Sequence, residues 1–325
     1  MKLVGTYHRC GITLLILSVF LSLMACNHRS HTAAGDLTEG HAEISKSFYT
    51  PPQPPATLPD SAQLVWLGEH YWDSLDYTDS TLTNNVDLIG PAFGNYLHLL
   101  LLLPAQQAAA SIKSMLNSAA TGNPAAFDLL IRWYEDALYD PNSPLRNEDL
   151  YIPVIEYIVT SPKVDSLRKI RPQYQLDMAL KNRPGEVATD FAYTTPDGHS
   201  HRLSALKANY TLLFFYNPDC PACKDVKDYI VVSDTFQNWI GKGRLRVLAV
   251  YPDEDLKLWR KRLAQMPEGW VTGCDPRHRL TNDRLYDLKA IPTLYLLDKG
   301  KRVILKDAPV EIVEEWFNDK LNLER

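Results

Sequence analysis

The sequence has little cysteine, no surplus of basic charge and no long apolar stretch. Five cysteines occur in 325 residues, whereas a disulfide scaffold usually exceeds about 8% cysteine. The 34 basic and 39 acidic side chains give a net charge of −5, so no basic excess points to nucleic acid as a partner. The apolar run 11–23 is too short for a transmembrane helix, which needs about 20 residues. What remains is an ordinary globular composition, and at roughly 150 residues per domain the length predicts about two domains.

The first 25 residues have the features of a secretory signal peptide. Basic residues precede the apolar run 11–23, whose length suits the h-region of such a peptide. The run ends in Leu23-Met24-Ala25-Cys26, which resembles the bacterial lipobox. The resemblance implies cleavage before Cys26 and acyl chains on that residue, and several chains should anchor it stably because one alone is marginal. The alternative is a plain signal peptide with an incidental cysteine.

Residues 26–60 are interpreted as a lipidated cysteine followed by a tether. The segment is polar and then rich in proline, so it cannot bury a core and should be extended and semi-rigid. With the anchor it predicts a protein held in the cell envelope and facing the periplasm. Asn27 stands where enterobacterial sorting to the inner membrane uses Asp, which favours the outer membrane. Cys10 would leave with the signal peptide.

Residues 61–183 are predicted to form an all-α domain. Apolar side chains recur at helical spacing, without the alternation typical of strands. The expected helices are 61–73, 91–103, 105–120, 125–139, 149–159 and 165–182. The segment Leu67-Gly68-Glu69-His70-Tyr71-Trp72-Asp73 resembles the start of a helical domain of unknown function that precedes thioredoxin-like domains in Bacteroidetes proteins. His70 and the neighbouring carboxylates Glu69 and Asp73 are interpreted as helix surface, not as a site.

Residues 184–325 show a different pattern, which predicts an α/β domain. The expected strands are 190–193, 210–216, 245–251, 293–297 and 302–306, and the expected helices are 221–239, 254–266 with Asp253 as its N-cap, and 311–322. The run 210–216 is continuously apolar, as a buried central strand is. From residue 210 the order is β-α-β-α-β-β-α, with Cys-x-x-Cys at the first strand–helix junction. The predicted fold is a thioredoxin-like α/β domain, a central mixed sheet flanked by helices, preceded by the separate all-α domain.

The motif Cys220-Pro221-Ala222-Cys223 is the predicted redox centre. A nucleophilic thiol must be ionised and exposed, and the start of a helix favours the anion through its unpaired N–H groups and dipole. Pro221 suits the first helical position, where a missing N–H costs nothing. Cys223 lies about one turn later and should be more buried. We therefore predict that Cys220 attacks a substrate disulfide and that Cys223 resolves the mixed disulfide.

A second element, Ile291-Pro292-Thr293, precedes a predicted strand, where a cis X-Pro bond can occur. Together with residues 184–191 (Pro-Gly-Glu-Val-Ala-Thr-Asp-Phe) and 212–223, it makes the C-terminal part of the chain resemble the membrane-tethered TlpA/ResA-like thioredoxins. The resemblance implies a thiol–disulfide oxidoreductase in which the cis-proline loop lies against the Cys pair. Pro292 then joins the catalytic site, and the residues expected to contact substrate are Ile291, Pro221 and Ala222.

The same resemblance implies the partners of the reaction. Substrates would be protein thiols or disulfides in the envelope, including apocytochromes before haem attachment, and electrons would come from a membrane donor or a thiol reductant. No cofactor is expected beyond the redox-active disulfide Cys220–Cys223, and no metal is expected.

Three positions depart from the family pattern. Asp219 stands where many thioredoxins have Trp before the first cysteine, and its charge would disfavour the neighbouring thiolate. Phe214 replaces the buried acid of the central strand, and Val226 replaces an occasional Glu. The proton acceptor for the second cysteine is therefore not identified. The carboxylates closest to it in sequence are Asp225 and Asp228.

Other readings of the cysteines and of the domain remain open. Cys274 is interpreted as a half-buried free thiol, with a regulatory or second resolving cysteine as the alternative. A zinc set of Cys220, Cys223, Cys274 and His278 lacks a standard ligand spacing. A peroxiredoxin-type enzyme would need Thr at position 217, where the chain has Asn. A binding protein that uses the thioredoxin domain as a scaffold is the remaining alternative.

Overall fold

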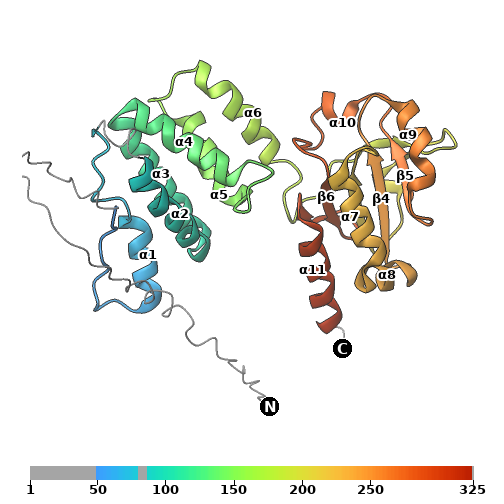
Figure 1. Cartoon of the computed structure of the whole chain (residues 1–325), viewed down its shortest axis with the longest axis horizontal. Coiled ribbons are helices and arrows are strands. Elements are labelled where there is room, and N and C mark those ends of the chain that lie inside the picture. Colours follow the sequence, from blue (N-terminus) through green and yellow to red (C-terminus); the bar gives the residue numbers. More distant parts are fainter. Residues whose placement is uncertain (1–48, 80–85, 324–325) are drawn as a thin grey trace, which may run out of the picture. The chain divides into compact units, whose positions relative to one another are not determined.

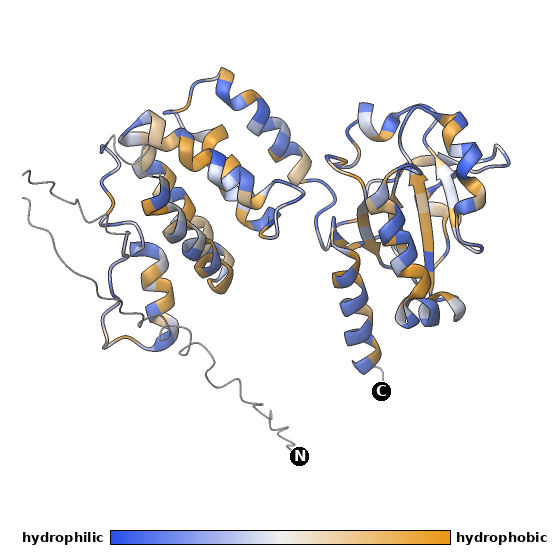
Figure 2. Cartoon of the chain, in the orientation of Figure 1, coloured by the Kyte–Doolittle hydropathy of each residue, from blue (hydrophilic) through white to orange (hydrophobic). Residues whose placement is uncertain are grey.

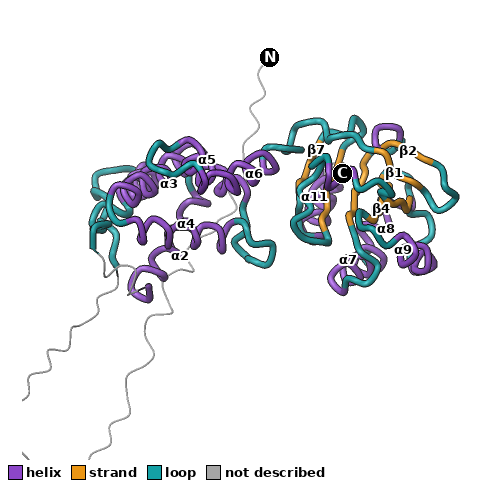
Figure 3. Tube along the Cα trace, turned by 90° about the horizontal axis from the view of Figure 1, so that it is seen from above, coloured by secondary structure: helices purple, strands orange, loops and turns teal. Residues whose placement is uncertain are grey.

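The computed structural model describes residues 49–79 and 86–323. The predicted signal peptide 1–25, Cys10, the lipidation site Cys26 and most of the tether lie outside these residues. Within the described part, no helix is both long enough and apolar enough to cross a membrane. The described residues belong to one compact unit, in which all strands follow the helical region (Figure 3).

The N-terminal domain is helical, which confirms the prediction. Its α-helices in the described residues are α1 (Asp60–His70), α2 (Val86–Leu102), α3 (Ala105–Thr121), α4 (Pro124–Leu138), α5 (Glu148–Thr160) and α6 (Ile170–Ala179). Their apolar faces share one core, in which Tyr96, Ile112, Leu116 and Tyr134 have no exposed surface. Asn123 and Asn147 cap α4 and α5 by accepting hydrogen bonds from backbone N–H groups of the first turn.

Two helix boundaries in this domain differ from the prediction. α2 begins at Val86, and Pro91 lies inside it instead of starting it. Pro91 is the sixth residue of α2, beyond the first turn, and the helix continues through it with one backbone N–H donor fewer. The predicted helix 165–182 is a short 3₁₀ turn (Leu167–Lys169) followed by the shorter α6.

The C-terminal domain is built on a seven-stranded mixed sheet with the order β2-β1-β5-β4-β3-β6-β7. The strands are β1 (Ala192–Thr194), β2 (Ser200–Arg202), β3 (Tyr210–Phe215), β4 (Leu245–Tyr251), β5 (Val271–Cys274), β6 (Thr293–Leu297) and β7 (Val303–Lys306). The helices are α7 (Pro221–Val232), α8 (Asp234–Gly241), α9 (Leu256–Arg262), α10 (Arg279–Asn282) and α11 (Val310–Leu323). β3 pairs parallel with β4 and antiparallel with β6. The predicted thioredoxin-like sheet flanked by helices is confirmed (Figure 1).

The central strands are buried on both faces. Leu212, Phe214 and Tyr216 join one apolar cluster with residues of α7, α8 and α11, whereas Leu213 and Phe215 join the cluster on the opposite face. In Figure 2 the strand β4 is coloured orange over most of its length, while α7 and α11 carry both colours. Because neither face meets water, these strands read as continuous apolar runs.

Three predictions in this domain were wrong in detail. The helix 221–239 is two helices, α7 and α8, because Ser233 is extended and caps α8 by accepting a hydrogen bond from Phe236 N. Asp253 is not an N-cap; Asp255 caps α9 instead. The short strands β2 and β5 were missed. β2 is polar and exposed, so it lacks the apolar pattern of a strand. β5 is interrupted by Gly273, which is needed because a Cβ atom there would lie 2.6 Å from the Tyr193 ring.

Candidate active site

Cys220 lies where the chain passes from the carboxyl end of β3 into α7. It is the N-cap residue of α7, and its Sγ accepts a hydrogen bond from Cys223 N at 3.2 Å. Pro221 occupies the first turn, where no N–H is needed. Cys220 is partly exposed, whereas Cys223 is 2% exposed. The geometry therefore offers one accessible sulfur with a second sulfur directly behind it.

The surroundings of Cys223 keep it protonated at neutral pH. Burial raises the pKa of the Cys223 thiol well above its ordinary value, and the neighbouring sulfur of Cys220 adds to this effect. A backbone hydrogen bond from Asn217 acts in the opposite direction. Both cysteines are free thiols in the structure.

The loop that precedes β6 faces the accessible sulfur. The Ile291–Pro292 peptide bond is cis, and Cys220 Sγ lies 3.6 Å from the carbonyl oxygen of Ile291. Thr293 Oγ1 donates a hydrogen bond to the carbonyl oxygen of Ala290 at 2.6 Å, which closes the loop. We call residues 290–293 the cis-proline loop. It and the Cys pair are 71 positions apart in sequence.

The structure thus brings the predicted site residues of the C-terminal domain to one place. Pro221 and Ala222 are exposed beside the first cysteine, and Ile291 and Pro292 are partly exposed. A pocket of about 410 Å³ opens between α7 and α9, and Cys223 is part of its wall.

The carboxylates singled out from the sequence do not serve Cys223. Asp219 is exposed and forms an ion pair with Arg262 at 3.1 Å, which offsets the charge expected to oppose the thiolate. Asp228 binds Lys224 at 2.6 Å on an exposed face of α7, and Asp225 is exposed. The position where the family has a buried acid on the central strand is occupied here by Phe214, which is fully buried.

Sequence reasoning missed Asp253 as a member of the site. Asn217 Nδ2 donates a hydrogen bond to Asp253 Oδ2 at 2.7 Å, and the charge of Asp253 contributes to the raised pKa of Cys223. The predicted order of the strands could have indicated this residue. Asp253 directly follows β4, the parallel neighbour of β3, and sites of open α/β sheets lie at the carboxyl ends of such strands.

The remaining candidates stay outside the dithiol site. Cys274 is 2% exposed, more buried than expected, and its Sγ lies 3.6 Å from the carbonyl oxygen of Thr194. Among the described residues, no group of three or more His, Cys, Asp or Glu side chains could hold a metal ion, so nothing supports the zinc alternative. His70 is on the surface of α1, where it pairs with Asp73 and its ring lies tilted against Trp66, with 4.4 Å between the ring centroids.

Comparisons with known proteins cover both domains. Residues 25–182 match a domain of unknown function (DUF5106), and residues 184–306 match the AhpC/TSA family. The crystal structure of a thioredoxin-like protein from Bacteroides caccae is similar with a TM-score of 0.80 and 36% identity, over 83% of this chain and 98% of that one. The match to DUF5106 agrees with the expected helical domain of unknown function ahead of a thioredoxin-like domain.

Two curated relatives each match about a third of the chain. Human nucleoredoxin is 26% identical over 124 residues, which are 37% of this chain and 27% of nucleoredoxin. Nucleoredoxin of Danio rerio is 28% identical over 112 residues, which are 34% of this chain and 27% of that protein. The chain therefore spans about a quarter of the length of the curated relatives that it matches.

Proposed function

The chain belongs to the thioredoxin-like proteins, and from that membership we propose that it is a thiol–disulfide oxidoreductase acting through Cys220 and Cys223. One observation carries the proposal. The partly exposed Cys220 Sγ lies 3.2 Å from Cys223 N at a helix start and 3.6 Å from the carbonyl oxygen of Ile291 in the cis-proline loop. The accessible sulfur, the resolving sulfur and a peptide-binding backbone edge therefore meet at one point.

The proposed reaction moves two electrons from the dithiol to a substrate disulfide. The Cys220 thiolate attacks one substrate sulfur, forms a mixed disulfide and releases the other substrate sulfur as a thiolate. That thiolate takes up a proton. Cys223 then loses its proton and attacks the sulfur of Cys220, which releases the second substrate thiol and leaves the disulfide Cys220–Cys223. A membrane electron donor or a thiol reductant would restore the dithiol, and no further cofactor takes part.

Reduction of insulin disulfides tests this proposal. With dithiothreitol as the recycling reductant, the full-length protein should accelerate insulin reduction by at least about tenfold over dithiothreitol alone. Equilibration with glutathione or dithiothreitol buffers then gives the direction of transfer. A potential near about −270 mV indicates a reductant, and one near about −120 mV indicates an oxidant. A protein that left insulin untouched but consumed hydrogen peroxide, or bound a partner without exchange, would contradict the proposal.

We also propose that the protein is anchored in the cell envelope through acyl chains on Cys26, on the periplasmic side and in the outer membrane. The lipobox-like segment that ends in Cys26 supports this. Expressed in a bacterium, the wild-type chain should take up labelled palmitate and sediment with membranes. Cys26→Ser should lose the label and the sedimentation, whereas Cys10→Ser, in the same leader, should keep both. Retention of the label by Cys26→Ser would exclude this anchor.

A further inference from the structure

The segment Arg284–Lys289, which leads from α10 into the cis-proline loop, is contacted by the helical domain and by the residues that follow α6. The Arg284 guanidinium lies 4.9 Å from the centroid of the Tyr174 ring on α6. Asn182 Nδ2 donates a hydrogen bond to the carbonyl oxygen of Leu285 at 2.9 Å. Asn182 and Leu285 are 103 positions apart in the sequence. The segment that leads into the cis-proline loop is therefore fixed by residues that precede the C-terminal domain.

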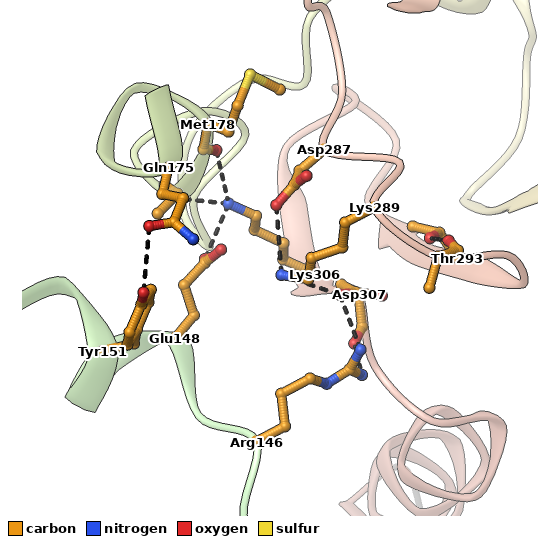
Figure 4. A network of polar contacts seen from close by, with 12 residues as sticks. Arg146, Glu148, Tyr151, Gln175, Met178, Asp287, Lys289, Thr293, Lys306 and Asp307 are labelled. Atoms are coloured by element: carbon orange, nitrogen blue, oxygen red, sulfur yellow. Dashed lines mark hydrogen bonds and ion pairs between the residues drawn. The ribbon is translucent and has the colours of Figure 1, made fainter. Parts of the chain in front are cut away.

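Lys289 makes the contact nearest to the active site, two residues before Ile291. Its side chain is only 16% exposed, and its Nζ lies 3.3 Å from Asp287 Oδ2 and 4.0 Å from Asp307 Oδ2. The same Nζ lies 4.4 Å from the ring centroid of Tyr139, which follows α4 in the helical domain. An ammonium this enclosed depends on its partners. Figure 4 shows Lys289 between the two carboxylates.

Asp307, one of those partners, is itself held by the helical domain. Arg146 Nη1 lies 3.1 Å from Asp307 Oδ2, and Arg146 Nη2 donates a hydrogen bond to the carbonyl oxygen of Asp307 at 2.8 Å (Figure 4). Burial raises the pKa of Asp307 to about 6, while Arg146 and Lys289 act to lower it. Asp307 also has a positive φ of 47°. Its backbone and side chain are therefore both fixed by one guanidinium.

Lys306 fixes the strand on the other side of the loop. Its Nζ lies 2.8 Å from Glu148 Oε2 (Figure 4). The same Nζ donates hydrogen bonds of 2.8 Å to the carbonyl oxygens of Ala179, the last residue of α6, and of Lys181. Lys306 is the last residue of β7, which pairs with β6 through Tyr295. β6 begins directly after Pro292. The helical domain therefore holds both the segment that enters the cis-proline loop and the hairpin that leaves it.

We propose that the helical domain positions the cis-proline loop against Cys220, with Lys289 as the positioning residue. The inference rests on the function proposed above. A disulfide carried on an extended peptide must lie along the backbone of Ile291 to reach Cys220, because that carbonyl oxygen lies 3.6 Å from the sulfur. A peptide that pairs with this backbone depends on where the loop stands, whereas a small aromatic disulfide needs only the exposed sulfur. The helical domain thus governs the docking of protein disulfides.

Substrate size separates this role from a general loss of structure. In the full-length protein, Lys289→Met and Tyr139→Leu should lower kcat/KM for insulin about tenfold, chiefly through KM, because small misplacements of a positioning group cost this much or more. Reduction of 5,5′-dithiobis(2-nitrobenzoate) by the same variants should stay within about twofold of wild type. Tyr139→Phe keeps the ring over Lys289 and should keep the activity with insulin.

Lys299→Met, on the exposed tip of the β6–β7 hairpin, is the matched control and should leave both activities unchanged. Hydrogen exchange of residues 287–292 should accelerate in Lys289→Met and not in Lys299→Met. The inference is overturned if the two activities fall together, or if neither falls while the wild type is active. A wild type inactive on both disulfides would instead overturn the proposed function, and this inference with it.

Discussion

Replacement of Cys220 by serine is expected to abolish disulfide exchange. Its Sγ is the accessible sulfur of the described cysteines, since Cys223 and Cys274 are each 2% exposed. A serine hydroxyl at the helix start cannot replace a thiolate in this reaction. Insulin reduction should fall by at least about 10³-fold, as expected when an essential nucleophile is removed. The measurement is the initial rate with dithiothreitol as reductant, corrected for the rate without protein.

Cys223→Ser should stop the reaction one step later. The first attack survives because Cys220 keeps its position, but no second sulfur remains to release the substrate. Mixed disulfides should accumulate and appear on non-reducing gels as adducts that dithiothreitol removes. Cys274→Ala is the control and should exchange disulfides like the wild type. If Cys220→Ser captured substrate and Cys223→Ser did not, the two roles would be reversed.

Lys306→Met should destabilise the protein by about 2–3 kcal/mol, because buried acceptors lose a charged hydrogen-bond donor. The Lys306 side chain is only 5% exposed. Its removal leaves the carbonyl oxygens of Ala179 and Lys181 without this donor, while Glu148 keeps its ion pair with Arg183 at 3.0 Å. Burial lowers the pKa of Lys306 and Glu148 opposes that effect, so the charge depends on its partners. Urea unfolding followed by circular dichroism gives the change.

The chain offers a matched control for this variant. Lys113 and Glu156 form an ion pair at the same 2.8 Å separation, but their side chains are 45% and 38% exposed. Exposed pairs contribute about 0–1 kcal/mol, so Lys113→Met should change the free energy of unfolding by less than about 1 kcal/mol. Equal losses of unfolding free energy in the two variants would contradict a larger contribution from the buried contacts of Lys306.

The parts of the fold that follow local patterns could be predicted from the sequence. The apolar periodicity of residues 105–120 gives α3, and the unbroken apolar run 210–216 gives β3, because each pattern reflects burial of a single element. The break at Ser233 could not be predicted in this way. Ser233 also bonds to Glu314, 81 residues later, and this partner becomes visible only once α11 is packed.

The residues of the site also differ in whether local sequence reveals them. Cys220 and Cys223 lie three residues apart, so the helix alone brings them together, and Pro292 was found through a recognisable motif. Asp253 and Lys289 were not found, because their partners Asn217 and Tyr139 are distant in sequence. An Asp before a helical pattern looks like an N-cap from sequence alone. Only the parallel pairing of β3 with β4 brings it beside the cysteines.

The contact of Lys306 with the end of α6 has a consequence for the order in which the protein is completed. The last carbonyl groups of a helix have no partners within it. The carbonyl oxygen of Ala179, the last residue of α6, accepts from Lys306 Nζ, which lies 127 positions later in the sequence. Because a chain is synthesised from its N-terminus, α6 leaves the ribosome well before Lys306 does. The end of α6 therefore gains its contact with Lys306 only after β7 has been translated.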